Sequence, residues 1–245
     1  MTVPKSHPRY VSLKIRDKIV AGVKKGIASL HGLTAHGRGE AFDYLFGEKT
    51  TPVAKKSIDS AAALLLLAKN PVISVNGNAA ALAAKELVQL SKAIPAKLEI
   101  NIFHASTERE TKIKKELIKN GAKEVLLPQK NCKIKYLDSN RKYVNKNGIY
   151  KADVVFVPLE DGDRTEALVK SKKKVIVVDL NPMSRSAQKA TITIVDNIIR
   201  TVPLLIMTIT KLKNYNKNEL QKIIKEYDNK KMLKKSLDTI NKNLA

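Results

Sequence analysis

Short apolar runs alternate with amphipathic segments from residue 71 onward, and this alternation constrains the fold more than any other feature of the chain. The runs are PVISV, KLEINIF, VVFVPL and VIVV, and each is four to seven residues long. Predominantly apolar runs of this length are typical of strands buried on both faces. Strands that alternate with helices pair in parallel, with helices on both faces of the sheet. The sequence therefore predicts an α/β fold built on a mostly parallel sheet.

The segments between these runs are predicted to be helices, apart from one polar stretch. Residues 129–150 are polar and irregular, which predicts a loop excursion from the sheet. The last helix of the alternating region contains an internal proline, Pro203. The expected helices cover 79–94, 107–121, 164–172 and 197–213, and two further strands are expected at 123–128 and 190–196.

Three helical stretches precede the alternating region. Residues 7–26 carry apolar side chains in i, i+4 steps and end at a glycine. A short helix is expected over 39–48, after a glycine-flanked turn. The third begins at Thr51-Pro52 and is apolar all round at 61–68, which predicts either a deeply buried helix or a subunit contact.

The chain is expected to form one α/β domain over residues 1–210, with N-terminal helices at 1–70 and the sheet core at 71–210. The tail at 211–245 has helical periodicity and little apolar content, so a basic helical tail is predicted there. No apolar signal segment or membrane span is recognisable, so we expect a soluble, cytoplasmic protein. The single cysteine, Cys132, excludes an intramolecular disulfide framework and a multi-cysteine metal site.

The formal net charge of +23 raises the question of nucleic-acid binding. Residues 109–151 hold thirteen basic residues against four acidic ones, and residues 211–245 hold ten against four. Nucleic-acid readers usually combine arginine with aromatic side chains, whereas this chain has 38 lysines, eight arginines and no tryptophan. A solvated lysine-rich surface is therefore favoured, and a polyanion-binding surface is the alternative.

Polar clusters follow three of the predicted strands, where ligands bind in open α/β sheets. The first cluster offers amide and backbone N–H groups for substrate hydroxyls or phosphate, and the second offers carboxylates for Mg²⁺ or an ammonium group. A solvated loop or a pair with Arg164 would explain the second cluster equally well. The candidate substrate-binding residues are Asn76, Gly77, Asn78, Glu160, Asp161 and Asp163.

The third cluster begins at Asp179, which closes the strand VIVV. An acidic residue at this position commonly accepts hydrogen bonds from ribose hydroxyls. Ser184, Arg185 and Ser186 follow at a predicted helix start, where backbone N–H groups and a guanidinium can bind phosphate. The alternative is structural, with Asp179 forming a turn and Ser184 capping the helix.

Several nucleotide and metal motifs are absent from the sequence. It contains no GxxxxGK[ST] loop, no GxGxxG after a strand and no His-x-x-x-His pair. In the stretch HGRG, glycines flank Arg38, which would let the backbone approach a ligand while the guanidinium reaches it. The alternative is a flexible turn between helices. The motifs thus disfavour a dehydrogenase and a P-loop enzyme.

Five ordered blocks over about residues 3–210 resemble the archaeal phosphopantothenate synthetase (4-phosphopantoate–β-alanine ligase) family. The blocks are PKSHPRYVSLKIRDKI, GLTAHGRGEAFDYLFGE, AAALLLLAKNPVISVNGNAAAL, IYKADVVFVPLEDGDRTEALV and VIVVDLNPMSRSAQKATITIVDNI. The resemblance implies a homodimer with a Rossmann-like core. It further implies an ATP-dependent ligase that condenses 4-phosphopantoate with β-alanine, giving 4′-phosphopantothenate, AMP and pyrophosphate through an acyl-adenylate, in coenzyme A synthesis.

The resemblance also implies ATP contacts, carried over by position. Arg16, Arg38 and Arg185 would act with Mg²⁺ to offset the charge that develops on the phosphates; the residues that hold the metal are not identified. The implied ATP-binding residues are Arg16, Arg38, Asp179, Leu180, Asn181, Arg185, Ser186, Asn197 and Ile198.

Two other functions are weighed against this one. A ligase of the same fold could act on unphosphorylated pantoate, and a Rossmann-like module could bind nucleic acid through 109–151 and the tail. Truncation near residue 210 is expected to abolish nucleic-acid binding but to leave ligase catalysis largely intact.

Overall fold

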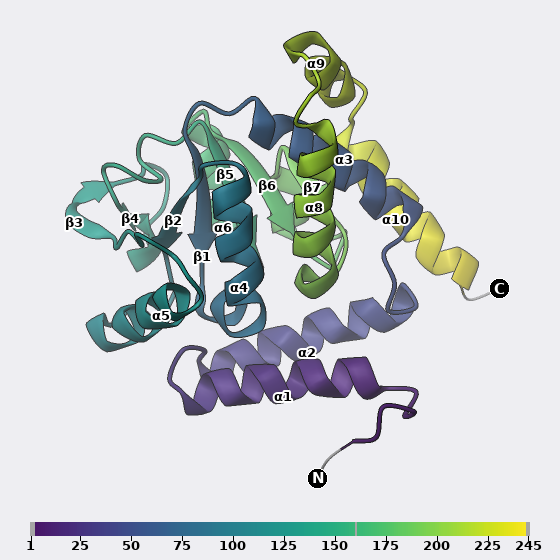
Figure 1. Ribbon diagram of the computed structural model, residues 1–245, viewed down its shortest axis with the longest axis horizontal. Coiled ribbons are helices and arrows are strands. Elements are labelled where there is room, and N and C mark those ends of the chain that lie inside the picture. Colours follow the sequence, from purple (N-terminus) through teal and green to yellow (C-terminus); the bar gives the residue numbers. More distant parts are fainter. Residues whose placement is uncertain (1–2, 160, 244–245) are drawn as a thin grey trace.

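A five-stranded sheet forms the centre of the computed structural model, which describes residues 3–159 and 161–243 (Figure 1). Its spatial order is β2-β1-β5-β6-β7, and every neighbouring pair is parallel. This confirms the predicted α/β fold with a mostly parallel sheet. The strands are β1 (Pro71–Val75), β2 (Lys97–Ile100), β5 (Val154–Pro158), β6 (Lys174–Val178) and β7 (Ile192–Ile194).

Apolar side chains leave the sheet alternately on its two faces, because successive side chains of a strand point in opposite directions. Ile73 and Phe156 belong to the larger core, which the sheet shares with α3, α4 and α8. Val155 and Val177 belong to a second core, beneath α6 and the 129–150 excursion. The sheet is thus buried on both faces, which explains why its strands are apolar rather than alternating.

Helices cover both faces of the sheet and one of its ends (Figure 1). Helices α3, α4 and α8 share one face, whereas α6 and α7 lie on the other, and α1 and α2 pair beyond the carboxyl ends of the strands. The helices are α1 (Tyr10–Lys24), α2 (Leu30–Leu45), α3 (Pro52–Leu66), α4 (Gly77–Ala93), α5 (Thr107–Lys119), α6 (Gly162–Lys170), α7 (Arg185–Lys189), α8 (Ile198–Leu212), α9 (Lys217–Lys225) and α10 (Asn229–Asn243).

Local sequence signals set several helix starts. Thr51 Oγ1 accepts a hydrogen bond from Ala54 N at 3.0 Å, with Pro52 at the first helical position, as predicted. Side chains of the same small polar class cap other helices at Ser29, Asn76, Ser106, Ser184, Asn197 and Asn216. The apolar stretch of α3 is buried in the core of its own chain, with Ala61, Ala62 and Ala63 fully covered.

Three local predictions were wrong. Residues 30–45 form a single helix, so Gly37 and Gly39 lie inside it and no turn flanks Arg38. Tertiary packing outweighs the cost of about 1 kcal/mol for each helical glycine. The expected strand 123–128 makes only an isolated bridge between Leu126 and Glu99. The excursion contains an antiparallel pair, β3 (Gln129–Lys133) with β4 (Tyr143–Val144), and a short 3₁₀ turn, Asn140–Lys142.

The two C-terminal helices pack against the core. Leu220 of α9 and Leu233 of α10 are buried, and α9 lies against α3. The hydroxyl of Tyr227, between the two helices, donates to the Thr193 carbonyl at 3.2 Å, and the Thr193 N–H donates back to it at 3.2 Å. The tail therefore covers the β7 edge of the sheet, which would otherwise expose backbone groups.

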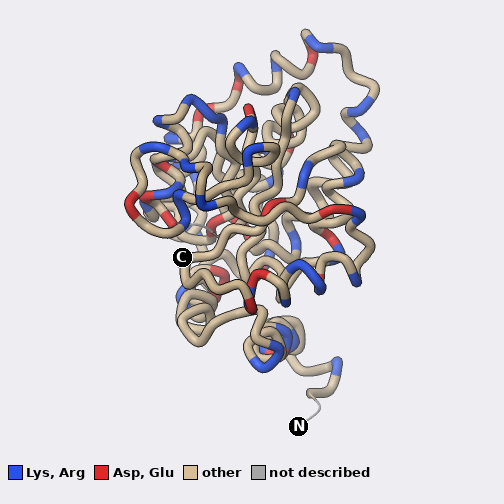
Figure 2. The backbone as a smooth tube through the Cα atoms, turned by 90° about the vertical axis from the view of Figure 1, so that its left-hand side faces the viewer, with Lys and Arg blue, Asp and Glu red and all other residues tan. Residues whose placement is uncertain are grey.

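Basic residues occur along the whole chain. In the view of Figure 2, Lys and Arg are interspersed with Asp and Glu along the whole chain rather than gathered in one segment. This distribution suits a solvated lysine-rich surface better than a continuous binding face. Within the described residues, none of the helices is both long and apolar enough to span a lipid bilayer.

Candidate functional site

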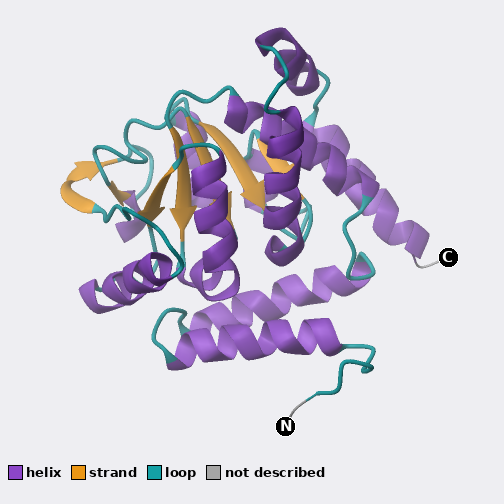
Figure 3. Ribbon diagram, in the orientation of Figure 1, coloured by secondary structure: helices purple, strands orange, loops and turns teal. Residues whose placement is uncertain are grey.

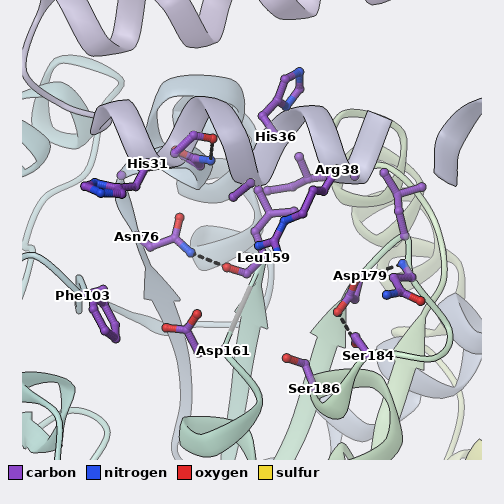
Figure 4. Close-up of a pocket in the computed structure, with 18 of the residues that line it drawn as sticks. His31, His36, Arg38, Asn76, Phe103, Leu159, Asp161, Asp179, Ser184 and Ser186 are labelled. Atoms are coloured by element: carbon purple, nitrogen blue, oxygen red, sulfur yellow. Dashed lines mark hydrogen bonds between the residues drawn. The ribbon is translucent and has the colours of Figure 1, made fainter. Parts of the chain in front are cut away.

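The strand order places a crevice between β1 and β5. The chain runs from β1 to β2 on one side and later returns to β5 on the other, so the order reverses at this point. Ligands of open α/β sheets bind at such a switch point, beyond the carboxyl ends of the strands. A pocket of about 750 Å³ lies there. Helix α2 crosses this end of the sheet (Figure 3), and residues of α2 line the outer side of the pocket (Figure 4).

Asn76 holds the two strands of the switch point together. Its Nδ2 donates to the carbonyl oxygens of Pro158 and Leu159 at 3.1 and 2.7 Å, and its Oδ1 accepts from Ala79 N at 2.9 Å. Leu159 adopts a φ of 56°, the left-handed region that non-glycine residues rarely occupy. Such backbone strain is often found at functional sites, where the surrounding structure enforces it.

Asp179 lies at one end of the pocket, where β6 stops. Its carboxylate accepts from Ser184 Oγ at 2.5 Å and from Asn181 N at 2.9 Å (Figure 4). Burial raises the pKa of Asp179, and the hydrogen bond from Ser184 opposes that rise. Each carboxylate oxygen can accept a second hydrogen bond, so the group can bind a ligand hydroxyl. Leu180 and Asn181 line the pocket beside it.

Arg38 projects from α2 into the pocket, where its side chain lies above Leu159 and between Asn76 and Asp179 (Figure 4). Its positive charge partly counters the rise that burial causes in the pKa of the Asp179 carboxyl. Within the described residues Arg38 has no salt bridge, so its guanidinium is available to a ligand anion. Ser186, Asn197 and Ile198 complete the Asp179 end of the pocket, together with the rim residue Arg185.

A buried ionic network fixes Asn197. Its Nδ2 donates to Asp43 at 2.9 Å, and Arg200 joins Asp43 to Asp196 through Nη2, at 2.5 and 2.6 Å. Thr50 Oγ1 donates to Asp196 at 2.6 Å. Burial raises the pKa of Asp196, and the positive charge of Arg200 counters it. The network connects α2 to the start of α8, and thus sets the position of one pocket wall.

Two arginines of the predicted site are held by carboxylates. Arg185 donates to Glu166 through Nε at 3.1 Å and through Nη2 at 2.5 Å. These bonds, together with Lys170 and Lys189, lower the pKa of Glu166 to about 2. Arg16 Nε donates to Glu40 at 2.8 Å, between α1 and α2. Arg16 does not line the pocket, unlike the other residues of the implied ATP set.

The candidate substrate residues also fall into two groups, those that line the pocket and those that do not. Asn76, Gly77, Asn78 and Asp161 line the pocket, whereas Asp163 lies outside its lining and Glu160 lies outside the described residues. The Asn78 side chain ties α4 to α2, because Nδ2 donates to the Gly32 carbonyl at 2.8 Å.

Asp161 is engaged as well, because its carboxylate accepts from Arg141 Nη1 at 2.6 Å. Asp163 Oδ1 accepts from the Arg164 N–H at 2.8 Å and so serves the first turn of α6. Among the described residues, the candidate substrate side chains therefore also hold in place the helices and strands that form the pocket.

The other end of the pocket contains residues that sequence reasoning missed. His31 of α2 and Phe103 lie there (Figure 4). His104, Arg109 of α5 and Arg141 line the same part of the pocket. The two arginines belong to the basic segment 109–151, for which the composition favoured a solvated lysine-rich surface. The missed signal was that they are the only arginines in that lysine-rich segment.

The carboxylates of the pocket suit Mg²⁺ only together with oxygen atoms that a ligand supplies. No group of three or more His, Cys, Asp or Glu side chains in the described parts of the chain is arranged to hold a metal alone. Mg²⁺ is commonly bound by one or two carboxylates together with substrate phosphates. Asp161 and Asp179 are carboxylates that line the pocket and could serve in this way.

The fold and the pocket define an α/β protein with a polar ligand pocket at the switch point of a parallel sheet. A family model described as phosphopantothenate/pantothenate synthetase matches residues 53–243. The chain therefore belongs to the phosphopantothenate/pantothenate synthetase family. The match includes α9 and α10, so it extends beyond the 3–210 stretch in which the sequence blocks were recognised.

Relatives in three archaea support the same family. A Thermococcus kodakarensis protein is 54% identical over 234 residues, which cover 95% of this chain and 90% of the relative. A Methanosarcina mazei protein is 48% identical over 99% of this chain and 95% of its own, and one from Methanospirillum hungatei is 45% identical over 99% and 98%. Each is named 4-phosphopantoate–β-alanine ligase.

Proposed function

We propose that this chain is an ATP-dependent ligase that joins 4-phosphopantoate to β-alanine, giving 4′-phosphopantothenate, AMP and pyrophosphate. The observation that carries the proposal is that one cavity has two chemically different ends. One end offers Asp179 and Arg38 to a nucleotide, and the other offers histidines and arginines to an anionic acid. A ligase needs ATP and its acid in a single cavity, because the carboxylate must reach a phosphate of ATP.

The first step is activation of the acid. The carboxylate oxygen of 4-phosphopantoate attacks the α-phosphorus of ATP, the bond to pyrophosphate breaks, and an acyl-adenylate remains. No nucleophile of the protein is required, so the site needs electrostatic stabilisation and positioning. Arg38 offsets the charge that develops on the phosphates, while Asp179 accepts hydrogen bonds from the ribose. Bound Mg²⁺ would neutralise part of the pyrophosphate charge.

The second step forms the amide. The ammonium group of β-alanine loses one proton to water and becomes the nucleophilic amine. The amine attacks the acyl carbon, the bond to AMP breaks, and the nitrogen loses a second proton to water. Asp161 at the pocket lining is the carboxylate best placed to bind the incoming ammonium, although it already accepts from Arg141. Leu180 and Ile198 provide apolar surface beside the reacting groups, which limits the access of water.

We also propose a homodimer. The apolar segment 61–68 is an unsuitable interface because it lies mostly in the core of its own chain. The outer surfaces of α1 and α2 leave Val11 65% exposed and Leu45 40% exposed, and are the better candidates. Light scattering on the purified protein should give twice the chain mass; a monomer at micromolar concentration would refute the dimer.

Identification of the nucleotide product tests the reaction. With ATP, Mg²⁺, 4-phosphopantoate and β-alanine, we expect AMP and pyrophosphate in equal amounts. ADP and phosphate would overturn the adenylation step. Arg38→Ala and Asp179→Asn should each lower kcat/KM by about 30-fold to 1,000-fold, which corresponds to roughly 2–4 kcal/mol. Lys85→Ala, an exposed cation of α4 outside both the pocket and the proposed dimer surface, is the control and should keep full activity.

A further inference from the structure

We propose that His31, His104 and Arg109 form the subsite that binds the phosphate of the acid substrate and selects the phosphorylated acid over free pantoate. This inference rests on the proposed ligase function. It assigns a role to the end of the pocket farthest from Asp179. Neither the sequence patterns nor the family resemblance gave that end a role.

Three separate segments bring these side chains together. His31 lies on α2, His104 on the loop after β2, and Arg109 on α5. The two imidazole rings lie 4.7 Å apart between centroids, and Arg109 Nη1 donates to the His104 carbonyl at 2.6 Å. Figure 4 shows His31 on one side of Asn76, and Asp179 with Ser184 on the other. The cluster is thus separated from the proposed nucleotide end.

Arg109 differs from the other arginines at this end and at the rim. Arg141 and Arg185 are paired with Asp161 and Glu166. In the described part of the chain, Arg109 has no carboxylate partner, and its Nε is buried without a hydrogen bond. Burial also lowers the pKa of Arg109. A guanidinium that is partly desolvated and not neutralised by a carboxylate favours an incoming anion.

The start of α4 adds backbone donors beside Arg109. The first amide groups of this 17-residue helix, at Gly77 and Asn78, have no acceptor within the helix. A Cβ at Gly77 would lie 2.5 Å from the Ile27 carbonyl oxygen and 3.1 Å from Arg109 Nη2. Glycine is therefore required for α4 to begin this close to the guanidinium. Both the helix dipole and the free N–H groups favour a bound phosphate.

The chemistry of the substrate fixes its direction in the pocket. In 4-phosphopantoate the carboxyl group is carbon 1 and the phosphate is on carbon 4, so the two anionic groups lie at opposite ends. The carboxylate must face the α-phosphorus of ATP, which leaves the phosphate directed away from Asp179. His31 and His104 can donate a hydrogen bond from a ring N–H in either protonation state. The far end thus offers donors where the phosphate has to lie.

Kinetics with both acids test the subsite. The variants are the double substitution His31→Ala/His104→Ala, Arg109→Gln, and the control Lys115→Gln, an exposed cation of α5 outside the pocket. For the first two variants we expect KM for 4-phosphopantoate to rise at least tenfold while KM for ATP changes less than twofold. The preference in kcat/KM for 4-phosphopantoate over pantoate should fall at least tenfold. The control should match the wild type.

Calorimetry of 4-phosphopantoate binding separates this inference from the ligase function. Binding by the wild type that weakens at least tenfold in both variants supports the subsite, even if no turnover were found. Equal binding and unchanged KM in the histidine double variant would overturn it and leave the ligase function standing. The double variant should fold, because neither exposed imidazole makes a hydrogen bond to the described residues, so it serves as the test if Arg109→Gln is unstable.

Discussion

Replacement of Arg200 by methionine tests whether the buried ionic network determines the shape of the proposed nucleotide end of the pocket. Asp43 and Asp196 are 4% and 2% exposed, and Arg200 is the cation that joins them. Methionine fills a similar volume but leaves two carboxylates without a counter-charge. Removing one member of a buried pair costs about 3–5 kcal/mol. For a domain of this size, that loss lowers Tm by about 6–20 °C.

The pH dependence of this loss has a definite sign. Burial raises the pKa of Asp196 above its ordinary value even with Arg200 present, and removal of the cation raises it further. A carboxyl whose pKa is higher in the folded state destabilises the fold once it ionises, and the penalty disappears as the pH falls toward the unfolded-state pKa of about 3.9. The deficit of Arg200→Met should therefore be smaller at pH 5 than at pH 8.

Urea unfolding followed by circular dichroism, together with KM for ATP, measures both consequences. Asn197 donates to Asp43, so KM for ATP should rise severalfold as this pocket wall loosens. The variant Asp43→Asn/Asp196→Asn/Arg200→Met removes the uncompensated charges and should recover much of the stability. A loss below about 1 kcal/mol at pH 8, or a loss that does not shrink at pH 5, would refute the electrostatic reasoning.

Other parts of the structure give four further predictions. Burial raises the pKa of Glu99 from 4.5 to about 7, so its ionisation should lower the free energy of unfolding by about 3 kcal/mol as the pH rises through that window. In Glu99→Gln, urea titrations at pH 4.5 and 7.5 should lack this component of the pH dependence. Tyr227→Phe should lower the free energy of unfolding by about 1 kcal/mol. Truncation at residue 210 should give a protein that aggregates in gel filtration, rather than the largely intact catalyst expected from sequence. Asn76→Ala should release Leu159 and reduce kcat/KM at least tenfold with circular dichroism unchanged; wild-type turnover would show that this tie is dispensable.

Local sequence patterns predicted the structure correctly where the conformation of a segment depends mainly on its own residues. The strands of the sheet were recognisable because burial on both faces requires apolar runs, and the start at Thr51-Pro52 was recognisable because capping is a local interaction. The residues around Asp179 could be placed at a strand end for the same reason. The prediction failed at 30–45, where packing against α4 and α1 keeps a glycine-rich sequence helical.

The sequence by itself determined an α/β class, the polar clusters at the strand ends and the family resemblance, because each depends on residues that are near neighbours in the chain. Only the tertiary structure decided the strand order, which puts the switch point between β1 and β5, and the position of α2 across it. It alone brought His31, His104 and Arg109 to one end of the pocket, and it kept Arg16 outside. These are contacts between distant segments, and side-chain packing in three dimensions, rather than local propensity, selects among them.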